Sequence, residues 1–334
     1  MRWRQNKNKG YETVDRLVKE AIYLHKKMVM ELNMNYKEPC LDTLKRMPND
    51  FIDSVITSPP YWQLRDYGYE GQWGLEPTYQ DYLQHLWLMM DLIWLKLKPT
   101  GTVWINLGDT YGTKSGSMGN GLFDPKNPIA TNTKFEQSQS IHKCLLLIPH
   151  RFAIGCIDRG WIVRNDIIWA KRNGMPESVT DRFSKKHEYF FFMVKSEKYY
   201  FDLGAIKDNA KPDKSLRDRD HTKLNNTPGR TRMAGLVHNS YTTKNPGSVS
   251  DFWDIPTKPS TEKHYASYND SLLTKPVLAG CPEGGIIYDP FMGTGSTAEV
   301  ALRTNRKFIG SEMSAEYCKI AQKRINKFTV ESLF

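Results

Sequence analysis

The sequence has no apolar run that could cross a membrane. Its longest uninterrupted apolar stretches, residues 145–149 and 189–194, are far shorter than the roughly 20 residues that span a bilayer. Residues 1–10 are basic and polar, with no apolar stretch behind them and no small-residue cleavage site, which is not the pattern of a secretory signal. We therefore expect a cytoplasmic protein that does not bind membranes.

Cysteine pairs are also lacking. The five cysteines are an odd number and none belongs to a Cys-x-x-Cys pair, so we expect neither a disulfide framework nor a zinc knuckle. We predict that the cysteines are reduced and buried. His142, Cys144 and His150 are close in the sequence, but the apolar run 145–148 between them is typical of a buried strand or helix. No metal site is expected there.

The composition is that of an ordinary folded protein with an excess of positive charge. The chain has 334 residues, of which 39% are apolar and 25% charged, and this excludes disorder throughout. The net charge of +10 and the pI near 9.2 favour a polyanionic partner, because Lys and Arg gain affinity by displacing the counterions of phosphates. Charge alone does not identify that partner.

Apolar spacing divides the chain into segments. Helical spacing over residues 11–32 predicts an N-terminal arm. Residues 111–139 are expected to be a polar surface loop. Residues 203–250 carry nine Lys or Arg against four Asp, so we expect an exposed, basic region. We predict strands at 51–57, 102–107, 161–169, 187–195, 285–288 and 307–311, and helices at 79–97, 296–303 and 315–327.

A glycine turn follows the predicted strand 285–288. Asp289-Pro-Phe-Met-Gly-Thr-Gly-Ser-Thr297 leads into a helix, whose N-terminal amides favour an anionic ligand group. Glu312 lies 23 residues after Asp289, at the end of the next strand, where it can accept hydrogen bonds from both hydroxyls of a ribose. By spacing alone, Gly293, Gly295 and Ala298 also fit a dinucleotide site, so an NAD-dependent dehydrogenase is an open alternative.

A second motif separates these alternatives. Thr57-Ser-Pro-Pro-Tyr-Trp62 stands at the carboxyl end of the predicted strand 51–57, where open α/β sheets bind ligands. The prolines stiffen the backbone, so the Ser58 hydroxyl and the Pro59 carbonyl can face one small planar group on which Tyr61 can stack. The alternative without function is a proline-stiffened turn with an incidental tyrosine.

Together the two motifs resemble those of the DNA amino-methyltransferases, and their order, catalytic loop first and cofactor loop last, resembles the beta class. The resemblance spans residues 38–330 apart from the two polar stretches. It extends through Trp104–Asp109, Trp161–Trp169, His187–Tyr189, Trp253–Pro256 and His264–Tyr268. It implies an α/β, Rossmann-like S-adenosylmethionine-dependent methyltransferase fold, with a mostly parallel seven-stranded sheet, helices on both faces and a small basic target-recognition region.

The resemblance also implies a domain organisation. Residues 1–33 are expected to form an N-terminal helical arm and residues 34–202 the catalytic half of the methyltransferase domain. Target recognition is assigned to residues 203–250 and the cofactor-binding half to residues 251–334.

Carried over by position, the resemblance implies roles for individual residues. Ser58, Pro59, Pro60 and Tyr61 are expected to hold the target base. The expected cofactor is S-adenosylmethionine, and its binding residues are Asp289, Phe291, Gly293, Gly295, Glu312, His264 and Ser267. Relatives often carry Gly-Asp before the Cys-Leu-Asp that residues 40–42 resemble. This chain has Glu38-Pro39 instead, so we assign no cofactor contact there.

The reaction implied is site-specific methylation of an exocyclic amino nitrogen in double-stranded DNA, on a base flipped out of the duplex, as in restriction–modification systems. Relatives that begin the catalytic motif with serine usually act on cytosine and those with aspartate on adenine, so Ser58 favours N4 of cytosine over N6 of adenine. Further alternatives are an RNA base, a protein glutamine, or a non-catalytic DNA-binding subunit. A cognate restriction endonuclease is a candidate partner, and the oligomeric state is left open.

Overall fold

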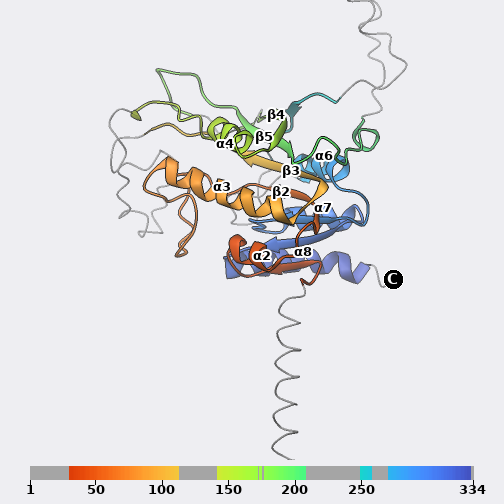
Figure 1. The fold of residues 1–334 in the computed structure, drawn as a ribbon. Coiled ribbons are helices and arrows are strands. Elements are labelled where there is room, and N and C mark those ends of the chain that lie inside the picture. The colour runs from red at the N-terminus through yellow and green to blue at the C-terminus, as the bar shows by residue number, and fades with distance from the viewer. Residues whose placement is uncertain are drawn as a thin grey trace, which may run out of the picture.

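The computed structural model describes residues 30–112, 141–171, 173–174, 177–207, 249–257 and 270–331 (Figure 1). Most of the predicted N-terminal arm, of the polar stretch 111–139 and of the target-recognition region 203–250 lies outside these residues, as do His264 and Ser267. Within the described residues, no helix is long and apolar enough to cross a membrane.

One mixed sheet forms the centre of the molecule. Its strands are β1 Met34–Tyr36, β2 Ile52–Thr57, β3 Leu97–Leu107, β4 Ile162–Ala170, β5 His187–Val194, β6 Phe252–Asp254, β7 Ile286–Asp289 and β8 Lys307–Ser311. Their order is β1-β8-β7-β2-β3-β5-β4-β6. Every neighbouring pair is parallel except the pairs of β5, which runs antiparallel to β3 and β4.

The described sheet has eight strands, so the predicted count of seven is wrong. The six strands read from the sequence are all present, as β2, β3, β4, β5, β7 and β8. The other two, β1 and β6, have three residues each and lie at opposite edges of the sheet. Three residues are too few to show a period-two pattern, so these strands are set by pairing with β8 and β4 rather than by a local signal.

Helices cover both faces of the sheet, as predicted. The helices are α2 Cys40–Arg46, α3 Tyr79–Lys96 and α4 Ile148–Ile157 on one face, and α6 Asp270–Gly280, α7 Ser296–Arg303 and α8 Ala315–Glu331 on the other, with a short 3-10 turn, η3, at Gly204–Ile206. In Figure 1, α3 and α4 lie to the left of the strands, and α6 lies to their right. Helix α3 begins after Thr78, whose hydroxyl accepts from the Asp81 N–H at 3.1 Å.

The strands carry apolar side chains toward both helix layers. In β3, Val103 and Ile105 pack in the core beneath α2, α3 and α4, whereas Trp104 packs in the core beneath α6, α7 and α8. The Trp104 ring stacks on Phe192 of β5 with centroids 4.1 Å apart. Because both faces are buried, the central strands are held rigidly, and so are the loops that leave their ends.

The cysteines are free thiols, but they are not all buried. Cys40, Cys156 and Cys281 are buried, whereas Cys144 is exposed and Cys318 is half-buried. The prediction of burial is wrong for Cys144 because it precedes α4 in an irregular segment, outside both helix layers. Among the residues that the structure describes, no three His, Cys, Asp or Glu side chains are grouped to hold a metal ion.

The carboxyl ends of β2 and β7 meet where the chain departs in opposite directions. The two strands are paired in parallel. From β2 the chain continues through α3 to β3 on one side, and from β7 it continues through α7 to β8 on the other. Such a switch point leaves a crevice outside the strand ends, where open α/β sheets bind their ligands.

Candidate active site

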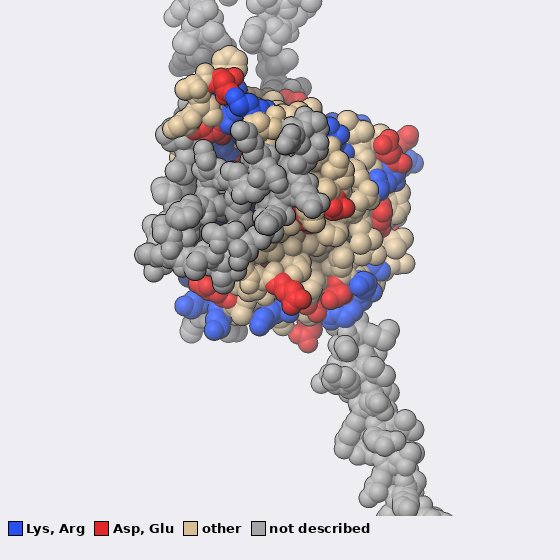
Figure 2. All heavy atoms as spheres, turned by 90° about the vertical axis from the view of Figure 1, so that its left-hand side faces the viewer, with Lys and Arg blue, Asp and Glu red and all other residues tan. Residues whose placement is uncertain are grey.

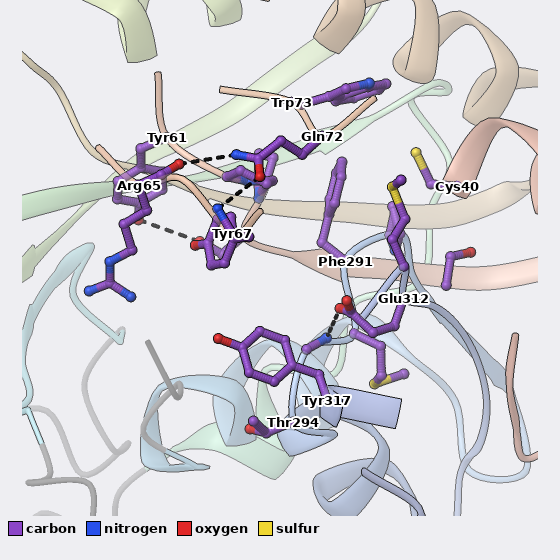
Figure 3. Close-up of a pocket in the computed structure, with 18 of the residues that line it drawn as sticks. Cys40, Tyr61, Arg65, Tyr67, Gln72, Trp73, Phe291, Thr294, Glu312 and Tyr317 are labelled. Carbon is purple, nitrogen blue, oxygen red and sulfur yellow. Dashed lines mark hydrogen bonds between the residues drawn. The ribbon is translucent and has the colours of Figure 1, made fainter. Parts of the chain in front are cut away.

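A cavity of about 630 Å³ opens at this switch point (Figure 3). The catalytic motif and the cofactor motif both line it. From the catalytic motif it is lined by Ser58, Pro59, Pro60 and Tyr61, and from the cofactor half by Phe291, Gly293 and Glu312. The fold thus brings together two motifs that are more than two hundred residues apart in the chain.

The catalytic loop, residues 57–62, is anchored on the side that faces the protein core. The hydroxyl of Tyr82, a fully buried residue of α3, donates to the Pro60 carbonyl at 2.8 Å. Trp62 is buried as well, and its indole N–H donates to the Glu76 carbonyl at 2.9 Å. Both anchors lie on the core side of the loop, which leaves Ser58 and Tyr61 facing the cavity.

The Tyr61 hydroxyl is the centre of a polar network. It lies 2.9 Å from Asn106 Oδ1 and 2.8 Å from Glu188 Oε2, both of which can accept a hydrogen bond from it. The Ser58 hydroxyl donates to the same Tyr61 oxygen at 3.4 Å. The Tyr61 ring lies so close to Gly108 that a Cβ there would come within 2.6 Å of a ring carbon. Ring and hydroxyl are therefore both fixed.

The partners of Tyr61 were not among the predicted site residues. Asn106 lies near the end of β3, Glu188 near the start of the antiparallel strand β5, and Lys171 just after β4. Lys171 forms an ion pair with Glu188, and its ammonium lies 4.2 Å from the centroid of the Trp169 ring. A signal was present, because all these positions fall at the edge of the sheet where the parallel strands end.

Glu312 lies at the end of β8 and faces the cavity. Its carboxylate accepts from the Gly293 N–H at 2.9 Å and from the Ser314 N–H at 2.7 Å, one bond to each oxygen. Burial raises the pKa of this carboxyl above its usual value, and the two backbone donors act in the opposite direction. Each oxygen keeps a second lone pair, so the carboxylate can still accept two hydroxyl donors.

Gly293 supports close approach of a ligand to the backbone. Its φ is +54°, and a Cβ placed there would meet only the Phe291 carbonyl oxygen, at 3.9 Å. The space beside it belongs to the cavity. The Phe291 ring also lines this space and meets Trp73 edge-on, with centroids 5.3 Å apart. The glycine turn after β7 therefore offers a ligand two features: backbone without a side chain at Gly293, and the aromatic ring of Phe291.

Two predicted cofactor contacts, Asp289 and Gly295, are not among the lining residues. The Asp289 carboxylate is buried and accepts from the Thr57 and Thr297 hydroxyls, each at 2.6 Å, and from the Phe291 N–H at 3.0 Å. Burial raises its pKa to about 6. Because Thr57 directly precedes Ser58, Asp289 joins the catalytic loop to the cofactor turn, and we interpret it as a residue that positions both.

Gly295 has a packing role. Its φ is +86°, and a Cβ there would lie 2.9 Å from the Cα and Cβ of Ala321 in α8. Replacing Gly295 with alanine is expected to lower the free energy of unfolding by about 3 kcal/mol, through backbone strain and overpacking together. Urea unfolding monitored by circular dichroism measures this change.

Gly284 is the matched control for this substitution. Its φ is +73°, but nothing lies within 4 Å of the added Cβ. Gly284→Ala is expected to cost only the backbone strain, about 1 kcal/mol. Equal losses in the two variants would show that contact with Ala321 is not the reason for glycine at position 295.

A segment between the catalytic loop and α3 also lines the cavity, although no motif in the sequence predicted a role for it. The cavity is lined here by Tyr69 and by four residues labelled in Figure 3, namely Arg65, Tyr67, Gln72 and Trp73. The Tyr69 hydroxyl shares a 2.7 Å hydrogen bond with the Ser314 hydroxyl, and the Tyr67 ring meets Tyr317 of α8 edge-on at 6.5 Å. Residues 64–73 therefore connect the side of the cavity formed after β2 to the side formed after β8.

Glu38 and Pro39, which replace the Gly-Asp that relatives often carry, also line the cavity. The Glu38 carboxylate accepts from the Thr43 hydroxyl at 2.7 Å and forms an ion pair with Arg46. These two contacts hold the Glu38 side chain against α2, and the Arg46 guanidinium compensates the negative charge of the carboxylate.

The positive charges of the face shown in Figure 2 are not gathered into one patch of described residues. On the face shown in Figure 2, Lys and Arg side chains lie among Asp and Glu side chains around the rim. The basic stretch on which the DNA prediction was based falls mostly outside the described residues. Its role in DNA binding therefore stays a prediction.

The chain is similar in sequence to known DNA methyltransferases. Residues 52–323 match the family described as DNA methylase. The chain is 34% identical to the type II methyltransferase M.Cfr9I of Citrobacter freundii over 306 residues, which cover 90% of this chain and 91% of that protein. It is 34% identical to the type II methyltransferase M.SmaI of Serratia marcescens over 285 residues, covering 85% and 87%.

Solved structures share the fold. The PvuII DNA methyltransferase, described as cytosine-N4-specific, superposes with a TM-score of 0.60 at 17% identity, covering 90% of this chain and 92% of that one. TTHA0409 of Thermus thermophilus, solved in complex with S-adenosyl-L-methionine, superposes with a TM-score of 0.53 at 20% identity, covering 87% and 91%.

Proposed function

This chain belongs to the DNA methylase family, and from that premise we propose that it methylates N4 of a cytosine flipped out of double-stranded DNA. As a member of the family it is a DNA amino-methyltransferase that uses S-adenosylmethionine, of the type found in restriction–modification systems.

The cavity fits S-adenosylmethionine. Its volume of about 630 Å³ is within the range of small-molecule pockets. Glu312 has lone pairs for two ribose hydroxyls, Gly293 offers a bare backbone position, and the Phe291 ring can pack on a purine. When bound, the cofactor supplies an electrophilic methyl group on a sulfonium. We propose that these three residues hold it, together with His264 and Ser267.

Ser58 carries the proposal of cytosine. Relatives whose catalytic motif begins with serine usually act on cytosine, and a neutral hydroxyl can donate to cytosine N3 or accept from the N4 amino group. The PvuII enzyme is described as cytosine-N4-specific. At 17% identity that likeness concerns the fold, so the base assignment depends on Ser58.

The catalytic residues act by orientation. An exocyclic amino group is a poor nucleophile because its lone pair is delocalised into the ring, and flipping the base costs a few kcal/mol. We propose that the Ser58 hydroxyl and the Pro59 carbonyl hydrogen-bond the amino group as it becomes tetrahedral, while Pro60 stiffens the loop and the Tyr61 ring stacks on the base. No covalent enzyme intermediate is needed.

Incubation with labelled S-adenosylmethionine and unmethylated genomic DNA, followed by nucleoside digestion and mass spectrometry, tests this function. We expect N4-methylcytosine as the labelled nucleoside. N6-methyladenine would overturn the base assignment and leave the rest in place. Parallel incubations with RNA and with protein test the other substrate classes: label in either of them but not in DNA would favour that substrate, and no transfer to any of the three would favour a DNA-binding subunit.

The partners proposed are double-stranded DNA and a cognate restriction endonuclease. The basic residues 203–250 carry the proposed target recognition, because they fall between the catalytic and cofactor halves. Deleting this segment should abolish site preference while leaving S-adenosylmethionine binding intact.

A further inference from the structure

Methylation of an amino group leaves a proton to be removed. The nitrogen starts with two hydrogens. As its bond to the methyl carbon forms and the carbon–sulfur bond breaks, the nitrogen becomes cationic, and it must then release one proton to give the neutral product. The Ser58 hydroxyl can pass a proton on but cannot keep an extra one, and the Pro59 carbonyl is no base. The proposed reaction therefore needs an acceptor beyond the catalytic loop.

A chain of hydrogen bonds leads from Ser58 to a carboxylate. The Ser58 hydroxyl donates to the Tyr61 oxygen at 3.4 Å, and the Tyr61 hydroxyl donates to Glu188 Oε2 at 2.8 Å. The first of these bonds is long, as hydrogen bonds in ligand-free active sites often are before they tighten in the reacting complex. All three side chains line the cavity.

Asn106 competes for the Tyr61 proton but cannot complete a transfer. Its Oδ1 lies 2.9 Å from the Tyr61 hydroxyl, and its Nδ2 donates to the Tyr189 carbonyl at 3.0 Å, which fixes the orientation of the amide. An amide oxygen accepts a hydrogen bond but is too weak a base to take the proton. Between Asn106 and Glu188, the carboxylate of Glu188 is the group that can become protonated.

Glu188 is suited to receive a proton and release it. Its side chain is 17% exposed, and it forms an ion pair with Lys171, whose side chain is 21% exposed. The ion pair orients the carboxylate and compensates its charge. A carboxylate can take this proton because the methylated, cationic amino group of an aromatic ring is a strong acid.

We propose that Glu188 is the final proton acceptor of methyl transfer, reached through Ser58 and Tyr61. The Ser58 oxygen takes the proton from the nitrogen as its own proton passes to the Tyr61 oxygen, and the Tyr61 proton passes to Glu188 Oε2. Ser58 and Tyr61 keep their number of protons and Glu188 gains one, which it later loses to water. The proposal depends on the function proposed above.

The first test is Glu188→Gln, which keeps the shape of the side chain but not its basicity. We expect the single-turnover rate on duplex DNA to fall about 10²-fold. The dissociation constants of S-adenosylmethionine and DNA should stay unchanged, because no binding contact is lost. Glu299→Gln is the control: Glu299 is 24% exposed and paired with Arg324 at 3.8 Å, but it does not line the cavity.

The second test is a double-mutant cycle with Tyr61→Phe. If Glu188 acts only through the Tyr61 hydroxyl, adding Glu188→Gln to Tyr61→Phe should not lower the rate further, because members of one relay are non-additive. Independent, multiplying effects would overturn the relay. So would a wild-type rate in Glu188→Gln.

Rescue by a small base separates proton acceptance from a structural role. Sodium formate should raise the rate of Glu188→Ala, because formate fits the vacated space and supplies a carboxylate. It should not raise the rate of Glu188→Gln, where the space is filled, or of Tyr61→Phe/Glu188→Ala, where the relay is broken. Equal stimulation of all three, or of none, would overturn the proposal. If the wild-type protein transferred no methyl group to DNA, the proposed function itself would fail.

Discussion

Replacing Ser58 with alanine is expected to lower the single-turnover rate of DNA methylation about 10³-fold, the upper end of what one oriented hydrogen-bonding group contributes. The hydroxyl is the proposed partner of the amino nitrogen and the first member of the proposed relay, so its loss removes both orientation and proton transfer. The affinity for S-adenosylmethionine should change little, because Glu312, Gly293 and Phe291 are untouched. Rapid-quench transfer assays and equilibrium binding measure the two quantities.

Ser54→Ala is the control for this experiment. Ser54 lies in β2, the strand that leads into the catalytic loop, and it is fully buried, with its hydroxyl 3.0 Å from that of Thr102 in the core. We expect a loss of about 1 kcal/mol in the free energy of unfolding and a normal rate. If Ser58→Ala methylated DNA at the wild-type rate, the proposed catalytic role of the loop would be wrong. A parallel loss of cofactor affinity would indicate that the substitution had distorted the site.

Replacing Asp289 with asparagine is expected to change how stability depends on pH. Burial raises the pKa of this carboxyl from 3.8 to about 6. The folded protein therefore holds the proton more tightly than the unfolded chain does. The stabilising effect of the protonated carboxyl is complete below pH 3.8 and is lost as pH rises through 6, for a total of about 3 kcal/mol.

Asparagine has no such proton and can keep most of the bonds. Its Oδ1 can accept from the Thr57 hydroxyl and the Phe291 N–H, and its Nδ2 can donate to Thr297. Relative to this variant, the wild-type protein should lose about 2 kcal/mol of stability between pH 4 and pH 7.5. Urea unfolding of both proteins without cofactor, at several pH values, measures the difference. A constant difference would mean that the Asp289 carboxyl does not change its protonation in this range.

The regular part of the fold followed from local patterns. The predicted helix 296–303 and strand 307–311 match α7 and β8, and the predicted helix 79–97 matches α3 to within one residue. These segments have strong periodicity or clear caps. Helices α2, α4 and α6 were not predicted: α2 has seven residues, α4 has ten and α6 contains Pro276, so none shows the uninterrupted pattern of a long helix.

The candidate site was predictable in part. Ser58, Tyr61, Phe291, Gly293 and Glu312 were identified because each belongs to a short motif whose residue types have a chemical reason, and all five line the cavity. Asp289 and Gly295 belong to the same motif but face the protein interior. A motif fixes which residues recur together, whereas the direction of each side chain depends on the backbone around it.

The sequence by itself determined the family, the methyl donor and the two loops that form the site. Each of these depends on a short motif of contiguous residues, and such a motif can be recognised before the fold is known. Only the tertiary structure decided which side chains surround Tyr61. Asn106 and Glu188 come from β3 and β5, strands that become neighbours only through antiparallel pairing in the sheet. Contacts of this kind join residues far apart in the chain, and no local pattern encodes them because they exist only once the sheet has assembled.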